Sequence, residues 1–151
     1  MKIRIELEET LEEAEVIIRC KSIDEKILHL QKLLKNETKT ETIQANREGK
    51  ECFLELKEIL FFETSDGMVH AHTKKAAYDV KYRLYELEEL LPGYFMRISK
   101  STVVNTSLIF SITKNLSSSS EIEFSNTHKK VYVSRHYNKA LKEKMKEERL
   151  R

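Results

Sequence analysis

The sequence predicts a mainly β protein, built from antiparallel strands and short helices, with a small β-β-α segment at its N-terminus. Short stretches of alternating apolar and polar residues follow one another from residue 42 to residue 134. Helical patterns are few and do not alternate with the strands, as they would in a parallel sheet. The chain has only 3 glycines and 1 proline, and the strand-like stretches follow one another with short turns.

The N-terminal segment begins with two stretches of strand character. "KIRIEL" (2–7) alternates with period two, and "VIIRC" (16–20) has the composition of a more buried strand. A helix follows from Ser22, because Glu25 stands three residues later, the spacing of a capping box. Its apolar residues recur on one face: Ile23, Ile27, Leu30, Leu33 and Leu34.

A boundary follows this helix. The stretch 36–42, "NETKTET", is polar and has the composition of a linker. We therefore expect two parts, residues 1–40 and residues 41–151. Whether the first part mediates dimerisation, docks a partner or packs on the second part is left open by its apolar helix face.

Residues 41–151 are expected to hold most of the strands. Asp66-Gly67 marks a hairpin turn, since Asp-Gly accepts the backbone conformation that tight hairpins require. Helices are expected over 81–93, ended by Pro92-Gly93, and over about 135–149. The expected strands are 42–46, 51–56, 59–64, 68–73, 76–80, 94–99, 102–105, 108–115, 121–125 and 130–134.

Composition limits the compartment and the class of protein. The chain has no run near the roughly 18 apolar residues that a membrane span needs, and its acidic N-terminus is unlike a signal peptide. We therefore expect a cytoplasmic protein. Cys20 and Cys52 are the only cysteines and make no disulfide framework.

Charge is unevenly distributed. The net charge is +2, but residues 91–151 carry 12 basic and 5 acidic side chains. This asymmetry indicates a polyanionic partner for the C-terminal part. A solvated face of the last, Lys- and Glu-rich helix is the simpler explanation for part of the excess, but residues 91–141 are basic without it.

Catalytic and cofactor motifs are missing from the sequence. There is no phosphate-binding glycine loop, nucleophile elbow or zinc-protease motif, so we expect no enzyme activity, no cofactor and no small-molecule substrate. His70 and His72 share one strand face and could begin a metal site, but no third ligand is evident. Packed or solvated strand histidines are favoured over that metal site.

Two clusters of basic and hydroxyl residues are more informative. "RISKS" (97–101) and "SRHYNK" (134–139) each lie where a strand ends. Both combine Arg or Lys with side chains that hydrogen-bond phosphates or base edges. Either alone fits a solvated turn, but two in a basic region indicate nucleic acid.

Three motifs in order carry a family resemblance. "EILFFET" (58–64), "LEELLPGYFMRISKSTVVN" (87–105) and "VYVSRHY" (131–137) resemble those of the LytTR DNA-binding domain of bacterial transcription regulators, over about residues 43–145. The resemblance implies an elongated, mainly β domain that contacts promoter DNA through loops rather than a recognition helix. Many members follow a receiver domain; this chain resembles a stand-alone regulator without one.

The resemblance also implies which residues contact DNA. The first loop offers Gly67 and Met68 where related domains often have His, Asn or an aromatic residue. Arg135 has the planar guanidinium suited to bidentate guanine or phosphate contacts, and Lys100 can donate to guanine or phosphate. The expected DNA-binding residues, from three loops, are Asp66, Gly67, Met68, Arg97, Lys100, Ser101, Arg135, His136 and Asn138.

The resemblance implies a function with one alternative. We expect a sequence-specific transcription regulator that acts on double-stranded promoter DNA as a homodimer. The alternative is a protein-interaction regulator that acts on a partner, such as an inhibitory membrane protein, with DNA binding weak or lost.

Overall fold

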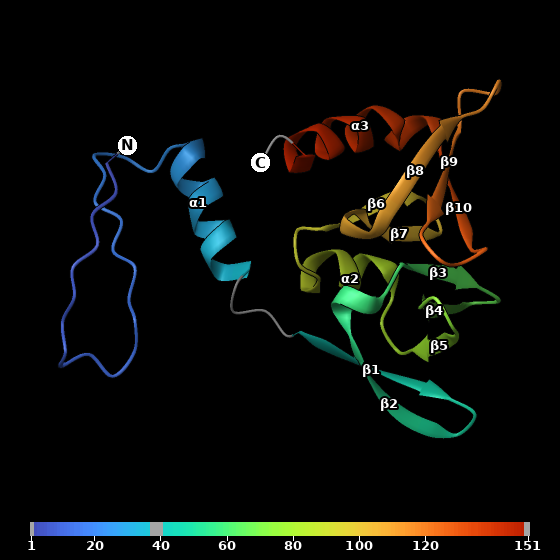
Figure 1. Cartoon of the computed structure of the whole chain (residues 1–151), viewed down its shortest axis with the longest axis horizontal. Helices are drawn as coiled ribbons and strands as arrows, with labels where there is room; N and C mark the ends of the chain where they lie inside the picture. The colour runs from blue at the N-terminus through green and yellow to red at the C-terminus, as the bar shows by residue number, and fades with distance from the viewer. Residues whose placement is uncertain (1, 37–40, 150–151) are drawn as a thin grey trace.

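The structure, a computed structural model, describes residues 2–36 and 41–149. Its helices are α1 (Glu25–Asn36), α2 (Leu84–Leu90) and α3 (Arg135–Arg149), arranged as in Figure 1. Short 3-10 turns occur at Leu56–Glu58 and Thr106–Leu108. The strands of the described residues are β1 (Thr42–Arg47), β2 (Lys50–Glu55), β3 (Phe61–Ser65), β4 (Met68–His72), β5 (Ala77–Val80), β6 (Phe95–Ser99), β7 (Thr102–Asn105), β8 (Ile109–Lys114), β9 (Ser120–Phe124) and β10 (Lys130–Val133).

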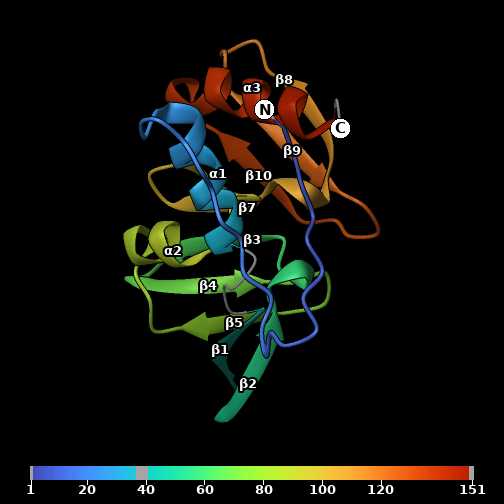
Figure 2. The same ribbon diagram turned by 90° about the vertical axis from the view of Figure 1, so that its left-hand side faces the viewer.

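Two antiparallel sheets form the body of the protein. The larger has the order β2-β1-β5-β4-β3-β7-β6, and the smaller has the order β10-β9-β8. Figure 2 shows α3 next to the smaller sheet and α2 beside the larger one. The predicted mainly β, antiparallel fold class is therefore confirmed.

The β3–β4 hairpin has the predicted tight turn. Ser65 pairs with Met68, and the two residues between them have positive φ angles, 53° at Asp66 and 77° at Gly67. Positive φ at both central positions is the requirement of a type I′ turn, which suits the twist of the strands and which Asp-Gly accepts.

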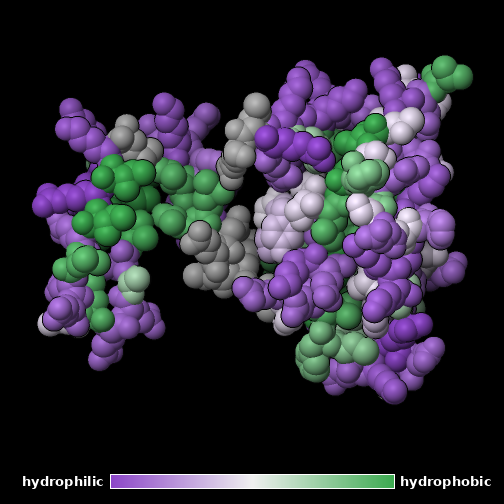
Figure 3. Space-filling model, viewed as in Figure 1, coloured by the Kyte–Doolittle hydropathy of each residue, from purple (hydrophilic) through white to green (hydrophobic). Residues whose placement is uncertain are grey.

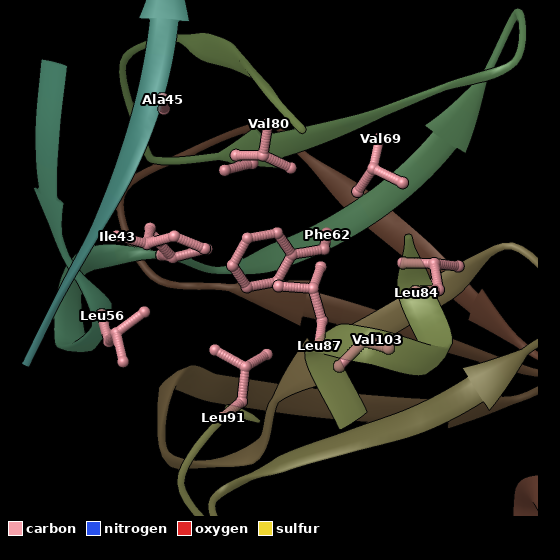
Figure 4. Packing of buried hydrophobic residues seen from close by; sticks show 12 residues of the cluster. Ile43, Ala45, Leu56, Phe62, Val69, Val80, Leu84, Leu87, Leu91 and Val103 are labelled. Carbon is pink, nitrogen blue, oxygen red and sulfur yellow. The ribbon is translucent and has the colours of Figure 1, made fainter. Parts of the chain in front are cut away.

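β3 and β7 are buried on both faces. Phe62 and Val103 face α2 in a cluster that Figure 4 shows from close by, with Leu84 and Leu87 of α2 directed into it. Phe61 and Val104 face the opposite way, into a second cluster with Ile98, the inner sides of β8–β10 and Leu141 of α3. Burial on both faces explains why each strand has two adjacent apolar residues, Phe61-Phe62 in β3 and Val103-Val104 in β7.

The second cluster fixes the relation between the two sheets and α3. Its contributors from the smaller sheet include Ile122 and Val133, which are 0% and 1% exposed. Leu141 of α3 is also fully buried there. Shared burial therefore packs α3 against β6 and against the inner side of the smaller sheet.

The N-terminal segment differs from the prediction. The two strands expected at 2–7 and 16–20 are not formed, and Figure 1 draws these stretches as two legs of an open loop. Ile3, Ile5 and Leu7 are 84–97% exposed. An isolated two-stranded hairpin with no covered apolar face is marginal in water, so the alternating pattern alone does not produce a sheet within one chain.

α1 and α2 begin later than expected, whereas α3 has the expected bounds. Asp24, not Ser22, caps α1, since its Oδ1 accepts the Ile27 N–H at 2.9 Å. α2 begins at Leu84 rather than at residue 81 and ends at Leu90. Much of the linker expected at 36–42 lies outside the described residues. No helix in the described ranges is long and apolar enough to cross a membrane.

Candidate nucleic-acid interface

Five segments that are distant in sequence meet at one end of the two sheets. We call this end the loop edge: residues 65–68, 81–83, 99–101, 114–119 and 134–139. Strand register places the first three together, because Ser65 pairs with Met68, Val69 with Val80, and Glu63 with Thr102. The turn 65–68, the exit of β5 and the β6–β7 turn therefore lie at the same end of the larger sheet.

A backbone hydrogen bond joins two of these loops directly. The Thr64 N–H donates to the Ser101 carbonyl at 2.8 Å. The β3–β4 turn and the β6–β7 turn are thus held next to each other beyond the last paired residues.

A second backbone hydrogen bond joins the smaller sheet to the larger. The pairing of β6 with β7 is irregular between Arg97 and Ser99, which leaves the intervening Ile98 outside the regular ladder, as in a β-bulge. Its carbonyl accepts the Ser134 N–H at 2.9 Å. Because Ser134 directly precedes α3, this contact brings the start of α3 to the β6–β7 turn.

Arg97 supports the β6–β7 turn from within. Its Nε donates to the Ser99 carbonyl at 2.7 Å, and one terminal nitrogen donates to the Lys100 carbonyl. Its other terminal nitrogen pairs with Glu88 of α2 at 3.0 Å. The side chain of Arg97, expected to contact DNA, is therefore engaged in holding the backbone of residues 99–101.

Two other predicted residues of the second loop and two of the third are exposed. Lys100 and Ser101 lie at the tip of the β6–β7 turn, and Arg135 and His136 begin α3. All four side chains are exposed, so both loops present hydrogen-bond donors to solvent. The structure brings these four residues, which come from two separate clusters in the sequence, to one edge.

The first loop supplies little charge. Asp66 and Gly67 are exposed and form the turn itself, and Met68 is 48% exposed. A carboxylate accepts hydrogen bonds and repels phosphates. Within the described loop edge, this turn therefore offers shape and one acceptor rather than a cationic contact.

Asn138 is placed differently from the prediction. It is 9% exposed, its Oδ1 accepts the Ser120 hydroxyl at 2.9 Å, and its Nδ2 donates to the Ser118 carbonyl at 3.3 Å. The amide is occupied on both sides, so Asn138 attaches the first turn of α3 to the β8–β9 loop. The sequence pattern of a helix does not show which way a polar side chain faces. The expected DNA contact of Asn138 is corrected, because its amide is buried and engaged.

Four further basic residues at the loop edge were not predicted. Lys81 and Arg83 follow the end of β5, Lys114 ends β8, and Lys139 lies in the first turns of α3; all four are exposed. Lys114 belongs here because it pairs with Ser120, which pairs with Val133. Strand order alone brings Lys81, Arg83 and Lys114 to this edge, so no local sequence motif could have identified these three, whereas Lys139 belongs to the cluster 134–139 seen in the sequence.

The histidine pair is packed rather than arranged for a metal. His70 Nδ1 lies 2.8 Å from Asp79 Oδ1, and the His72 ring stacks on Phe61 with centroids 4.3 Å apart. Among the described residues no group of three His, Cys, Asp or Glu side chains could hold a metal ion. The packed alternative therefore describes this pair.

His72 is kept neutral by its surroundings. Burial, together with the smaller effects of the nearby charges of Lys129 and His70, lowers the pKa of His72 to about 4. Lys129 Nζ lies 3.4 Å from His72 Nδ1 and 2.9 Å from the Ala76 carbonyl. Glu63 Oε2 is 3.8 Å from His72 Nε2, but with a neutral imidazole this contact is not an ion pair at neutral pH.

Comparison with protein families identifies the domain. Residues 49–146, well over half of the chain, match the LytTr DNA-binding domain. The chain belongs to the LytTR DNA-binding domain family. The predicted resemblance is thereby confirmed, and the LytTR family is one of DNA-binding domains rather than a class of enzymes.

Relatives of this LytTR chain are found in Staphylococcus aureus. One, an uncharacterized HTH-type transcriptional regulator of strain bovine RF122 / ET3-1, is 33% identical over 92 residues, which are 61% of this chain and 62% of the relative. Another uncharacterized HTH-type transcriptional regulator, from strain NCTC 8325 / PS 47, is 25% identical over 145 residues, covering 96% of this chain and 98% of the relative.

A solved LytTR structure has the same fold. The LytTr DNA-binding domain from Bacillus cereus superposes with a TM-score of 0.65 at 22% identity, covering 69% of this chain and 95% of that chain. The LytTR fold thus accounts for most of the described β domain.

Proposed function

We propose that this chain is a sequence-specific transcription regulator that binds double-stranded promoter DNA through the loop edge. One observation carries the proposal. The turn holding Lys100 and the helix start holding Arg135 are joined, through β6, by the Ser134–Ile98 hydrogen bond. Two exposed cations that are 35 residues apart in the sequence therefore act from one rigid frame, as loop-based recognition of DNA requires.

Each residue of the loop edge has a proposed role. Arg135 is the candidate for bidentate contact with guanine or phosphate, and Lys100 for a base or a phosphate. Ser101 and His136 add local hydrogen bonds to the backbone of the DNA. Lys81, Arg83, Lys114 and Lys139 supply phosphate contacts that position the domain without reading sequence.

The first loop has a steric rather than an electrostatic role in this proposal. The turn at Asp66 and Gly67 presents the Met68 side chain at the edge, where an apolar group can contact a thymine methyl. Arg97 acts as a positioning residue, because its donors are engaged with residues 88, 99 and 100.

In this proposal the chain regulates a promoter in the bacterial cytoplasm, and it does so as a homodimer. Two copies of a loop edge would contact two half-sites, whose spacing reflects the twofold symmetry of the dimer. The names of the Staphylococcus aureus relatives, transcriptional regulators, support this class of function.

The test is fluorescence anisotropy of the full chain with DNA from upstream of its own gene, compared with a shuffled duplex over a range of salt. We expect tighter binding to the native duplex, with an affinity that falls linearly with salt on a log–log plot. Equal binding to both duplexes at every salt concentration would reject the proposal. It would favour the alternative, a regulator that acts by binding a protein such as a membrane partner.

A further inference from the structure

The N-terminal segment exposes many apolar side chains. Figure 3 shows them gathered on the part of the molecule that lies away from the sheets. Exposed apolar side chains gathered in this way mark an interaction site. The large exposed residues of the segment include Ile3 at 88%, Ile5 at 84%, Leu7 at 97%, Val16 at 68% and Ile17 at 64%.

The first leg of this segment, residues 2–8, has one apolar and one charged side. Lys2, Arg4, Glu6 and Glu8 line one hollow together with residues of the second leg, including Glu15 and Arg19. Because side chains of an extended chain alternate between its two sides, Ile3, Ile5 and Leu7 lie on the side away from that hollow. The stretch 2–8 therefore has the two-sided character of a strand but no strand partner within the described chain.

The charges along residues 2–8 are self-complementary. In an antiparallel pair of two such stretches centred on Ile5, Lys2 lies opposite Glu8 and Arg4 lies opposite Glu6. On the other side, Ile3 lies opposite Leu7 and Ile5 lies opposite itself. Every charged pair is of opposite sign and every apolar residue meets an apolar residue, which is the arrangement that stabilises cross-strand neighbours.

Other registers of the same pair are disfavoured. A shift by two residues in one direction places Arg4 opposite Arg4, and in the other direction places Glu6 opposite Glu6. A parallel, in-register pair places Lys2 opposite Lys2 and Glu8 opposite Glu8. Like charges directly opposite destabilise a strand pair, and a shift by one residue would turn the apolar side outward.

We propose that residues 2–8 form an intermolecular antiparallel strand pair with the same residues of a second copy of this chain, about a twofold axis through Ile5. The contact is isologous, so it closes as a dimer. The unpaired backbone of each strand gains a partner, as in strand addition at a sheet edge. The apolar sides of both copies then form one surface that the second legs and α1 can cover.

The position of the segment is compatible with the loop edge remaining free. In Figure 1 residues 2–36 lie at the left, whereas the β3–β4 turn and the β8–β9 loop project to the right. The pairing gives the proposed homodimer its contact surface. Its test measures mass without DNA, so it can fail independently of DNA binding.

The charge pattern allows a test by mixing. An acidic variant, Lys2→Glu with Arg4→Glu, and a basic variant, Glu6→Lys with Glu8→Lys, each place only like charges opposite one another in the homodimer. In a mixed dimer of the two, all four charged pairs are attractive again. We expect the full-length wild type to sediment as a dimer, each variant to dissociate at least roughly tenfold more readily, and an equimolar mixture to regain the wild-type mass.

The register is tested separately by cross-linking. In a background with Cys20→Ser and Cys52→Ser, Ile5→Cys places two thiols opposite each other, within the Cα separation of about 4.4–6.8 Å that a disulfide needs. Ile3→Cys is the matched control, since its two copies would be offset by four residues, about 13 Å along the strands. We expect a covalent dimer from Ile5→Cys on mild oxidation and little from Ile3→Cys.

Each contrary outcome counts against the proposal. A monomeric wild type, or charge variants that dimerise like the wild type, would overturn the strand pair. A mixture of the two variants that stays monomeric would do the same, as would equal cross-linking at positions 3 and 5. Circular dichroism of each variant, unchanged from the wild type, establishes that a lower mass reflects dissociation rather than unfolding.

Discussion

Arg97 and Glu88 form an ion pair that ties α2 to the β6–β7 turn, with Nη1 3.0 Å from Oε2. The side chain of Arg97 is only 20% exposed, against 41% for Glu88. With two further hydrogen bonds to the carbonyls of Ser99 and Lys100, Arg97 acts on the turn from beneath rather than on a ligand from outside.

We predict that Arg97→Ala weakens specific DNA binding by releasing this turn. Hydrogen bonds from a charged group contribute about 1.5–3 kcal/mol, so a rise in Kd of roughly tenfold, about 1.4 kcal/mol, is expected. Amide hydrogen exchange of residues 99–101 should accelerate in the free protein. Glu88→Gln keeps both backbone contacts and should have a clearly smaller effect on both measurements.

Arg135 should show the signature of a base-reading residue. Arg135→Ala is expected to cost on the order of 1–3 kcal/mol on the native duplex and to reduce the preference over a shuffled one. Arg135→Lys keeps the charge but loses the bidentate guanidinium. Compared with Arg135→Ala, it should therefore regain affinity for the shuffled duplex but little of the preference for the native duplex. If Lys restores both fully, the contact is to phosphate.

Asn138 and its neighbour Lys139 should separate stability from DNA binding. Asn138→Ala leaves the buried Ser120 hydroxyl without its acceptor, which costs about 1–3 kcal/mol of unfolding free energy in a urea titration. Lys139→Ala, at an exposed position, should change that free energy by no more than about 0.5 kcal/mol. It should instead reduce the slope of log affinity for DNA against log salt concentration by the equivalent of about one phosphate contact. The reverse pattern would contradict both placements.

His72 should make the fold sensitive to acid. Its pKa is about 4 in the folded protein, below the value of about 6.5 in the unfolded chain. The unfolded state therefore binds the proton first, so this contribution to stability is present above about pH 6.5 and is lost as the pH falls towards 4. The loss, for about 2.5 pKa units at 1.36 kcal/mol each, is on the order of 3 kcal/mol.

Urea titrations between pH 7 and pH 4 measure this effect. His72→Phe preserves a ring that can stack on Phe61 but does not titrate, so the pH dependence should become shallower. His29→Gln on α1 is the matched control for loss of one histidine elsewhere. An unchanged pH dependence in His72→Phe would show that other groups dominate the acid response.

The sequence was sufficient to predict most of the β domain. Period-two alternation located the strands, and Asp66-Gly67 located a hairpin whose backbone has the required positive φ angles. Phe61, Phe62, Val103 and Val104, the apolar pairs of the predicted strands 59–64 and 102–105, are buried. These features depend on neighbours within a few residues, which is the range over which sequence patterns are informative.

What the sequence could not supply depends on distant partners. Arg97 and Asn138 have the residue types of DNA contacts, but Arg97 is also paired with Glu88, 9 residues away, and Asn138 is bonded to Ser120, 18 residues away. Lys81 and Lys114 reach the loop edge only through strand order. The alternation of residues 2–7 is a strand pattern without a partner in its own chain, so it produced a strand prediction that the described structure does not fulfil.

The central claim is that DNA binds at the loop edge, and paired removal of two cations tests it most directly. Lys100→Ala with Arg135→Ala removes two charges from the loop edge, whereas Lys74→Ala with Lys75→Ala removes two from the β4–β5 connection, at the opposite end of β4 from the 65–68 turn. In anisotropy titrations over a salt series, the first variant should lose its preference for the native duplex. The slope of log affinity against log salt concentration should also become shallower, by the equivalent of roughly two phosphate contacts at most.

The second variant should keep the wild-type preference and slope. Native-duplex binding by the Lys100 and Arg135 variant that equals the wild type, or a loss of preference in the Lys74 and Lys75 variant instead, would contradict the assignment of the loop edge as the DNA-binding surface.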